Sequence, residues 1–79
     1  MKYTFVISGQ PVELEFAPST PAQNVVIVAL HLTRHDVPQP SEWELRTADG
    51  YLFDPQKPIA DRASEHDTLY LNPRAGVGG

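Results

Sequence analysis

Hydrophobic and polar residues alternate along several segments of the chain, with the period of two that is typical of strands with one face in water. The first two segments are residues 2–8 and 12–16, and the short break between them predicts a hairpin. Pro11 cannot donate a hydrogen bond to a neighbouring strand, so we expect it at the start of the second strand. We expect this strand at the edge of the sheet, where outward Glu13 and Glu15 would discourage pairing with other molecules.

A helix is predicted to follow the hairpin. Thr20 is expected as the N-cap, Pro21 as the first helical residue, and Gln23 as the partner that closes a capping box with Thr20. The helix should end near Asp36, because Pro38 restricts the residue before it to extended conformations.

One face of this helix is predicted to pack on the sheet. At about 100° per residue, the positions on this face are Ala22, Val25, Val26, Ala29, Leu32 and Thr33. Asn24, His31 and His35 fall on the opposite face, and the pattern does not decide whether Ile27 contacts the core. The β-branched run at 25–28 has poor helix propensity, so its helicity must come from packing, and a strand is the competing interpretation.

Three further strands are expected after the helix, at 41–47, 51–53 and 68–72. The first two of them are joined by a turn that contains a glycine. The intervening segment 54–67 holds two prolines and few apolar residues. We expect it to wrap around the body as a loop that Ile59 attaches to the core.

Length and composition favour one small folded domain. The 79 residues are 41% hydrophobic and 20% charged, which is ordinary globular composition. We expect a folded body at 1–72 and a flexible tail at 73–79, because the tail contains three glycines and has no periodicity.

Charge and cysteine content argue against several classes of function. Ten acids against six bases give a net charge of −4, which opposes binding to nucleic acid. Without cysteine the chain cannot form disulfides, thiolate metal sites or a thiol nucleophile. No segment approaches the roughly 20 apolar residues of a membrane span, and the apolar run near the N-terminus is too short for a signal peptide. We therefore expect a soluble, cytoplasmic monomer that does not bind membranes.

Other groups that could carry chemistry lack the pattern they would need. His31 and His35 share one helical face, but no third ligand is placed to complete a metal site. Asp61, Glu65 and Asp67 lack the spacing and the glycine of a calcium-binding loop. The serines have no nucleophile-elbow pattern around them. We therefore expect no catalytic residue and no bound metal or cofactor.

Two parts of the sequence carry a family resemblance. Residues 12–20 read Val-Glu-Leu-Glu-Phe-Ala-Pro-Ser-Thr, and Asn24 with Val25 follows them. They resemble the second strand, the Pro-Ser turn and the helix start of ubiquitin. Residues 68–71, an arginine at position 74 and the diglycine at 78–79 resemble the last strand and the conjugation tail of ubiquitin. The resemblance implies an α+β, ubiquitin-like β-grasp fold with a mixed sheet of four to five strands, ordered ββαβ(β)β, packed on one helix.

Residues 43–50, together with the glycine-rich end, are similar to small bacterial ubiquitin-like modifiers found beside their own activating and conjugating enzymes. This resemblance implies that a partner activating enzyme uses ATP to adenylate the carboxylate of Gly79. The acyl group would pass to an enzyme cysteine as a thioester and then to an amine of a target protein, from which a deconjugating protease could release it. Gly78 and Gly79 suit a narrow channel because they lack Cβ atoms. Arg74 and Gly76 would position the tail.

The outer sheet face is the expected docking surface. In the β-grasp strand order the first, last and third strands are neighbours, so outward Val6, Tyr70 and Arg46 should cluster. The corresponding patch of ubiquitin is aliphatic, so recognition by general ubiquitin-binding modules is not expected. An ordinary wet sheet face is the alternative interpretation.

Two other functions fit the same fold. In the sulfur carriers of thiamin and molybdopterin synthesis, the adenylated diglycine end becomes a thiocarboxylate that donates sulfur. A β-grasp domain can also act as a non-covalent interaction module, for which the tail is irrelevant. The resemblance of the helix entry and of the last strand to ubiquitin favours the protein modifier.

Overall fold

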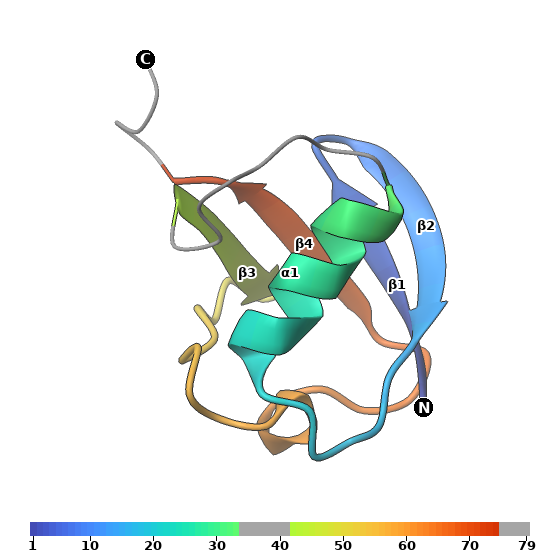
Figure 1. The fold of residues 1–79 in the computed structure, drawn as a ribbon, viewed down its shortest axis with the longest axis vertical. Helices are drawn as coiled ribbons and strands as arrows, with labels where there is room; N and C mark the ends of the chain where they lie inside the picture. Colours follow the sequence, from blue (N-terminus) through green and yellow to red (C-terminus); the bar gives the residue numbers. More distant parts are fainter. Residues whose placement is uncertain (34–41, 75–79) are drawn as a thin grey trace.

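The computed structural model describes residues 1–33 and 42–74. Its elements, in chain order, are β1 (Lys2–Ile7), β2 (Gln10–Glu15), α1 (Ala22–Leu32), β3 (Trp43–Thr47), the 3-10 helix η2 (Ile59–Asp61) and β4 (Thr68–Pro73). The strands form one mixed sheet in the order β2-β1-β4-β3, and α1 packs across one face of it (Figure 1). Within the described residues, a mixed sheet packed on one α-helix confirms the predicted α+β fold class, and the strand order places β2 at an edge as expected. No described helix is long and apolar enough to cross a membrane.

The first and last strands pair in parallel at the centre of the sheet. Phe5 of β1 is the register partner of Leu69 on β4, and Ile7 is the partner of Leu71. All four side chains are buried against the helix, as the alternation of polar and apolar residues predicts. The flanking pairs, β1 with β2 and β3 with β4, are antiparallel.

The hairpin between β1 and β2 turns at two residues. Ile7 pairs with Gln10, so Ser8 and Gly9 form the whole connection. Both have positive φ angles, +50° and +86°. Two positive φ angles are what a tight hairpin turn of type I′ requires, and glycine adopts this conformation without steric cost.

The start of α1 differs from the prediction. Pro21 is the N-cap and no side chain caps the helix, so the predicted capping box of Thr20 with Gln23 is wrong. The first helical N–H groups donate instead to a loop that is distant in sequence: Ala22 to the Lys57 carbonyl at 2.9 Å and Gln23 to the Pro55 carbonyl at 3.0 Å. Backbone carbonyls satisfy the donors that a capping side chain would otherwise satisfy.

The buried face of α1 is also shifted relative to the prediction. Ala22, Val25, Val26 and Ala29 are buried as expected, but Leu30 completes the core and Leu32 is 58% exposed. Leu30 lies one turn after Val26 on the core-facing stripe. Leu32 lies at the edge of this stripe and is the last residue of the helix. Helix extends over 25–28, which rules out the competing strand.

Other positions on the helix agree with the prediction or resolve what it left open. Asn24 and His31 are exposed as expected. Ile27, whose position the pattern did not decide, is 44% exposed. His35 and the predicted helix end at Asp36 lie outside the described residues.

The strands at the far side of the sheet have different bounds from those predicted. β3 begins at Trp43, and β4 includes Pro73, one residue beyond its expected end. Residues 51–53 do not form a strand, because only an isolated bridge joins Leu52 to Arg46. The backbone still follows β3 there, since Phe53 N–H donates to the Leu45 carbonyl at 2.9 Å.

The long loop is attached to the core as predicted. Ile59 opens η2 and is fully buried. Its N–H donates to the Thr20 carbonyl at 2.8 Å, which ties the loop to the entry of α1.

We predict that Ile59→Ala lowers the free energy of unfolding by about 2–5 kcal/mol, because it leaves a cavity that a hydrogen-bonded loop cannot close. Ile27→Ala is the matched control, since the same side chain is 44% exposed there; we expect a change of at most about 0.5 kcal/mol. Urea unfolding followed by the fluorescence of Trp43, the single tryptophan of the chain, measures both. Equal losses in the two variants would contradict the anchoring role of Ile59.

Candidate functional site

The three residues expected at the docking surface form one row across the outer face of the sheet. Val6 on β1 is the register partner of Tyr70 on β4, and Tyr70 is the partner of Arg46 on β3. The neighbours of Tyr70 along the strand, Leu69 and Leu71, are buried, so Tyr70 points to the opposite side and is 38% exposed. The structure thus brings the three residues together, and their role in binding stays a prediction.

Arg46 is held in place by its neighbours. Its Nε donates to Glu44 Oε1 at 3.1 Å, and its Nη1 donates to the Gly50 carbonyl at 2.8 Å. The Arg46 side chain is 42% exposed, so the ion pair itself adds at most about 1 kcal/mol to stability. These contacts restrain the guanidinium, and the row therefore contains a tyrosine on β4 and a restrained cation on the neighbouring strand β3.

The turn beneath Arg46 is ordered by side-chain hydrogen bonds. The Thr47 hydroxyl donates to the Asp49 carboxylate, and this bond lowers the pKa of Asp49. The same hydroxyl accepts the Tyr51 N–H at 3.0 Å, and the Arg62 guanidinium lies 4.3 Å from the centre of the Tyr51 ring. The Gly50 carbonyl that binds Arg46 belongs to this turn, where Gly50 adopts a φ of +95°.

The base of the tail is fixed at the end of β4. The Arg74 N–H donates to the Glu42 carbonyl at 2.8 Å, one residue beyond the last register pair, Trp43 with Pro73. Because β4 lies between β1 and β3, the last described residue, Arg74, follows an interior strand of the sheet and not an edge strand. The other predicted tail residues, Gly76, Gly78 and Gly79, lie outside the described residues.

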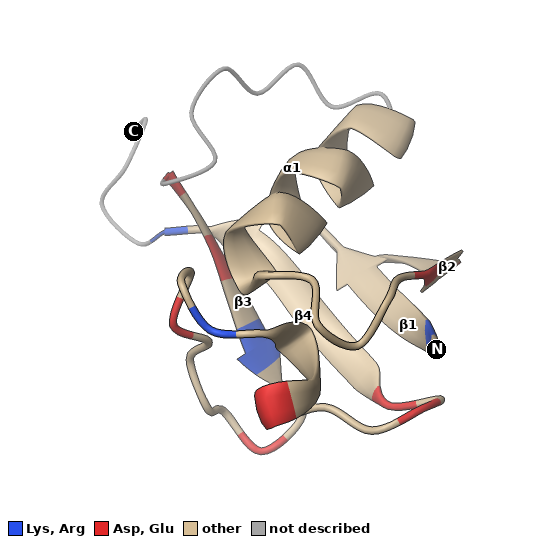
Figure 2. Cartoon of the chain, turned by 60° about the horizontal axis from the view of Figure 1, so that its bottom comes forward, with Lys and Arg blue, Asp and Glu red and all other residues tan. Residues whose placement is uncertain are grey.

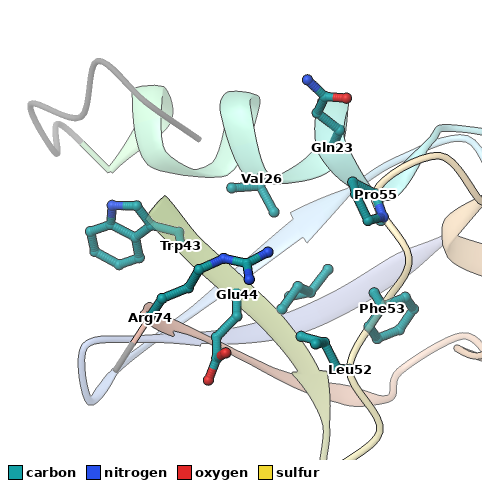
Figure 3. Close-up of a pocket in the computed structure, with 10 residues that line it drawn as sticks. Gln23, Val26, Trp43, Glu44, Leu52, Phe53, Pro55 and Arg74 are labelled. Atoms are coloured by element: carbon teal, nitrogen blue, oxygen red, sulfur yellow. The ribbon is translucent and has the colours of Figure 1, made fainter. Parts of the chain in front are cut away.

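An apolar pocket opens beside Arg74, between the first half of α1, β3 and residues 52–55. It has a volume of about 140 Å³. Val26, Trp43, Leu45, Leu52 and Phe53 line it, with Arg74 at the same pocket. In Figure 3 the Arg74 side chain extends from the end of β4 across β3 in the direction of α1.

This pocket was not predicted from the sequence. Its walls come from four separate segments, none of which is distinctive alone. One signal was present: Leu52 neighbours a residue that the core needs, Phe53, so its own side chain had to point elsewhere. Leu52 is 40% exposed.

Charged residues lie away from the helix. The eleven residues of α1 include no lysine, arginine, aspartate or glutamate, and Figure 2 shows the acids and bases on the strands, the loops and the short helix η2. Ile27, Val28 and Leu32 are exposed on the outward side of α1. The acids and bases of the described surface are therefore on the sheet, the turns and the long loop with η2.

The acids and histidines considered at the sequence level have local structural contacts. Asp67 Oδ2 accepts the Ser64 N–H at 2.8 Å, and the His66 N–H donates to the Lys2 carbonyl at 2.7 Å. His31, Asp61 and Glu65 are exposed. Among residues 1–33 and 42–74, no group of three or more histidine, aspartate and glutamate side chains is placed to hold a metal ion.

Comparison with solved structures identifies the fold. The ubiquitin of Caldiarchaeum subterraneum superposes with a TM-score of 0.76, covering 100% of this chain and 98% of that protein. The two sequences are 24% identical, so the likeness shows the fold alone. The predicted ubiquitin-like β-grasp fold is therefore confirmed.

Comparison of sequences gives a relative and a family. The uncharacterized protein y4jI of Sinorhizobium fredii (strain NBRC 101917 / NGR234) is 40% identical over 76 residues. The match covers 94% of this chain but 58% of y4jI, so the chain spans a little over half the length of that relative. A family model described as "Protein of Unknown function (DUF2604)" matches residues 1–79. The chain thus belongs to the DUF2604 family, and its body has the fold of ubiquitin.

Proposed function

We propose that this chain is a ubiquitin-like protein modifier whose Gly79 carboxylate is activated and joined to target proteins. One observation carries the proposal: the diglycine lies a short, defined distance in sequence beyond the point where the sheet fixes the chain. The last described backbone hydrogen bond is made by Arg74, so five residues, 75–79, follow it. At about 3.5 Å per extended residue they can reach at most about 18 Å from the body. This reach suits a carboxylate that must enter the active site of another protein.

The proposed chemistry needs groups that a partner supplies. Attack of the Gly79 carboxylate on the α-phosphorus of ATP forms an acyl adenylate and releases pyrophosphate. A cysteine thiolate of the enzyme then displaces AMP to form a thioester, and an amine of the target displaces the thiol to form an amide. ATP is consumed by the activating enzyme, and this chain contributes the carboxylate and the surfaces that the enzymes recognise.

The fixed end of β4 supports separate roles for the two parts of the chain: the body is recognised by the enzymes, and the tail carries the reacting carboxylate. Arg74 is held by its backbone, which leaves its side chain to meet acids on a partner. The middle residue of the row, Tyr70, is on β4, the strand from which the tail begins, so an enzyme that holds the row also sets the position of the base of the tail. This arrangement supports a role for the row in recognition by activating and conjugating enzymes.

The first test asks whether the carboxylate of Gly79 is the reacting group. We expect the chain that ends at Gly79 to support ATP–pyrophosphate exchange with its activating enzyme and to form an adduct that thiol reductants cleave. A semisynthetic chain that ends in Gly79 carboxamide keeps every side chain but lacks the nucleophilic carboxylate, so it should do neither. Exchange at an equal rate with both chains would refute activation at Gly79.

Mass spectrometry of the products separates the proposed modifier from its alternatives. Branched Gly-Gly remnants on other proteins support the modifier. Replacement of one terminal oxygen by sulfur would indicate a sulfur carrier instead. Undiminished biological activity after deletion of Gly78 and Gly79 would indicate a non-covalent module.

Self-conjugation has few acceptor sites, because Lys2 and Lys57 are the only lysines. We predict that the double variant Lys2→Arg, Lys57→Arg still modifies other proteins, while products that link two copies through lysine disappear. Both side chains are on exposed residues, and the Lys57 contact that caps α1 is made by its backbone, so the body should fold normally. Immunoblots and peptide mass spectra of the conjugates measure this. Loss of all conjugates in a folded double variant would contradict the prediction.

A variant of the sheet face tests recognition separately from chemistry. We predict that Tyr70→Ala slows thioester formation by about tenfold, because exposed tyrosines at interface centres are common energetic anchors. Leu32→Ala is the control, since Leu32 is 58% exposed on α1, away from the row. Single-turnover charging and circular dichroism are the measurements. An unchanged rate of thioester formation with folded Tyr70→Ala would contradict a role of the row in recognition and would indicate an ordinary solvated sheet face.

A further inference from the structure

We propose that the pocket beside Arg74 is a docking site for a short segment of a partner protein that presents one leucine- or phenylalanine-sized side chain next to an aspartate or glutamate. The proposal rests on the proposed function, because it names the chemistry by which a charging partner would hold the base of the tail. Three observations carry it: the size and lining of the pocket, the rigidity of its walls and the charge at its rim.

The size of the pocket sets the size of the anchor. Its volume is about 140 Å³. A buried apolar cavity of about 150 Å³ holds one benzene molecule, whereas sites for small-molecule ligands and cofactors usually measure about 300–1,000 Å³. The walls of Val26, Leu45 and Phe53 are apolar and belong to the core, and exposed Leu52 adds an outer wall. The pocket therefore suits a single apolar side chain and is too small for a nucleotide or a similar ligand.

The walls are held by hydrogen bonds, so the pocket exists before a partner arrives. The Gln23 N–H at its edge donates to the Pro55 carbonyl at 3.0 Å, and both residues line the pocket. The Gln56 amide donates to Gln23 Oε1 at 3.3 Å, and the Gln56 N–H donates to Asp54 Oδ1 at 2.9 Å. On the other side the Phe53 N–H is bonded to β3. A preformed pocket requires little ordering when a side chain enters, which favours binding.

The charge at the rim selects the residue next to the anchor. Arg74 lines the pocket, and no carboxylate of the described residues lies within ion-pair distance of its guanidinium. Glu44 also lines the pocket, but its carboxylate is bonded to Arg46. A partner carboxylate would meet a cation beside an apolar wall, where a charged hydrogen bond is stronger than in open water. The complementary segment is therefore apolar and acidic, and a basic segment would be repelled.

The test begins with a selection of random peptides displayed on phage against the full chain 1–79, without ATP. We expect the recovered peptides to combine an acidic residue with a neighbouring leucine, isoleucine, methionine or phenylalanine. Their binding should change the fluorescence of Trp43, which lines the pocket and is the single tryptophan. Recovery of peptides without this acidic and apolar pair, or failure to recover binders, would overturn the proposal.

Matched variants locate the binding. Leu52→Asp places a carboxylate in the outer wall and should weaken the selected peptides at least about tenfold, whereas Leu32→Asp, on the exposed side of α1, should leave the affinity unchanged. Arg74→Glu should also weaken them about tenfold, and it should bind peptides whose acid is replaced by lysine better than the parent chain does. Equal binding to the parent and to folded Leu52→Asp, or no rescue by the lysine peptides, would overturn the proposal.

The failure of this inference can be told apart from failure of the proposed function. The chain ending in Gly79 carboxamide cannot be adenylated but retains the pocket, so it should bind the peptides with unchanged affinity. Peptide binding without charging of the normal chain would contradict the modifier role and leave the docking site intact. The opposite result would contradict only the docking site: no peptide binds the chain, and the variants Leu52→Asp and Arg74→Glu are charged as fast as the parent chain.

Discussion

The parallel pairing of β1 with β4 is the contact on which the rest of the molecule depends. It joins the two ends of the described chain, from Thr4 with Thr68 to Ile7 with Leu71. The pairing must close a loop of some sixty residues, which costs conformational entropy before any contact forms. Burial of Phe5, Ile7, Leu69 and Leu71 beneath the helix offsets this cost. The same pairing puts Val6 beside Tyr70 and makes β4 an interior strand of the sheet, so the candidate sites follow from the core contact.

The long loop after β3, at residues 54–67, contributes to the structure in two ways. Its carbonyls at Pro55 and Lys57 accept the first N–H groups of α1, and Ile59 inserts into the core. A loop that caps a helix with its backbone does not depend on a particular side chain at the cap. The chain is hydrogen-bonded both to β3, through Phe53 just before the loop, and to the start of α1, through Pro55 in the loop, and both of these residues line the pocket beside Arg74. The loop thus contributes both to the stability of the body and to the shape of the pocket beside Arg74.

Much of the fold can be predicted from local sequence patterns, whereas the predictions that were wrong concern features that depend on contacts between distant segments. The strands around Phe5, Leu14 and Leu69 were predictable because a one-residue error in register would move their apolar side chains to the wrong face. The capping role assigned to Thr20 failed because carbonyls more than thirty residues away take its place. The assignment of Leu32 in place of Leu30 to the core failed because the helix axis, which sequence does not give, decides which edge of the stripe faces the sheet. The pocket combines four segments, so no single segment could indicate it.

Glu44 connects the two candidate surfaces. It lies on β3 and lines the pocket, while its carboxylate bonds to Arg46 in the row on the outer face of the sheet. The Arg46 and Glu44 side chains are 42% and 22% exposed, so their ion pair contributes at most about 1 kcal/mol to stability. Glu44 is the ion-pair partner of Arg46, and no ion pair among the described residues involves Arg74. Arg46 is further restrained by the Gly50 carbonyl, so the row carries a guanidinium that already has partners, whereas Arg74 at the pocket has no carboxylate partner among the described residues. The row and the pocket therefore differ in their charge: the row holds a paired guanidinium, and the pocket holds one without a carboxylate partner among the described residues, although both lie next to β4.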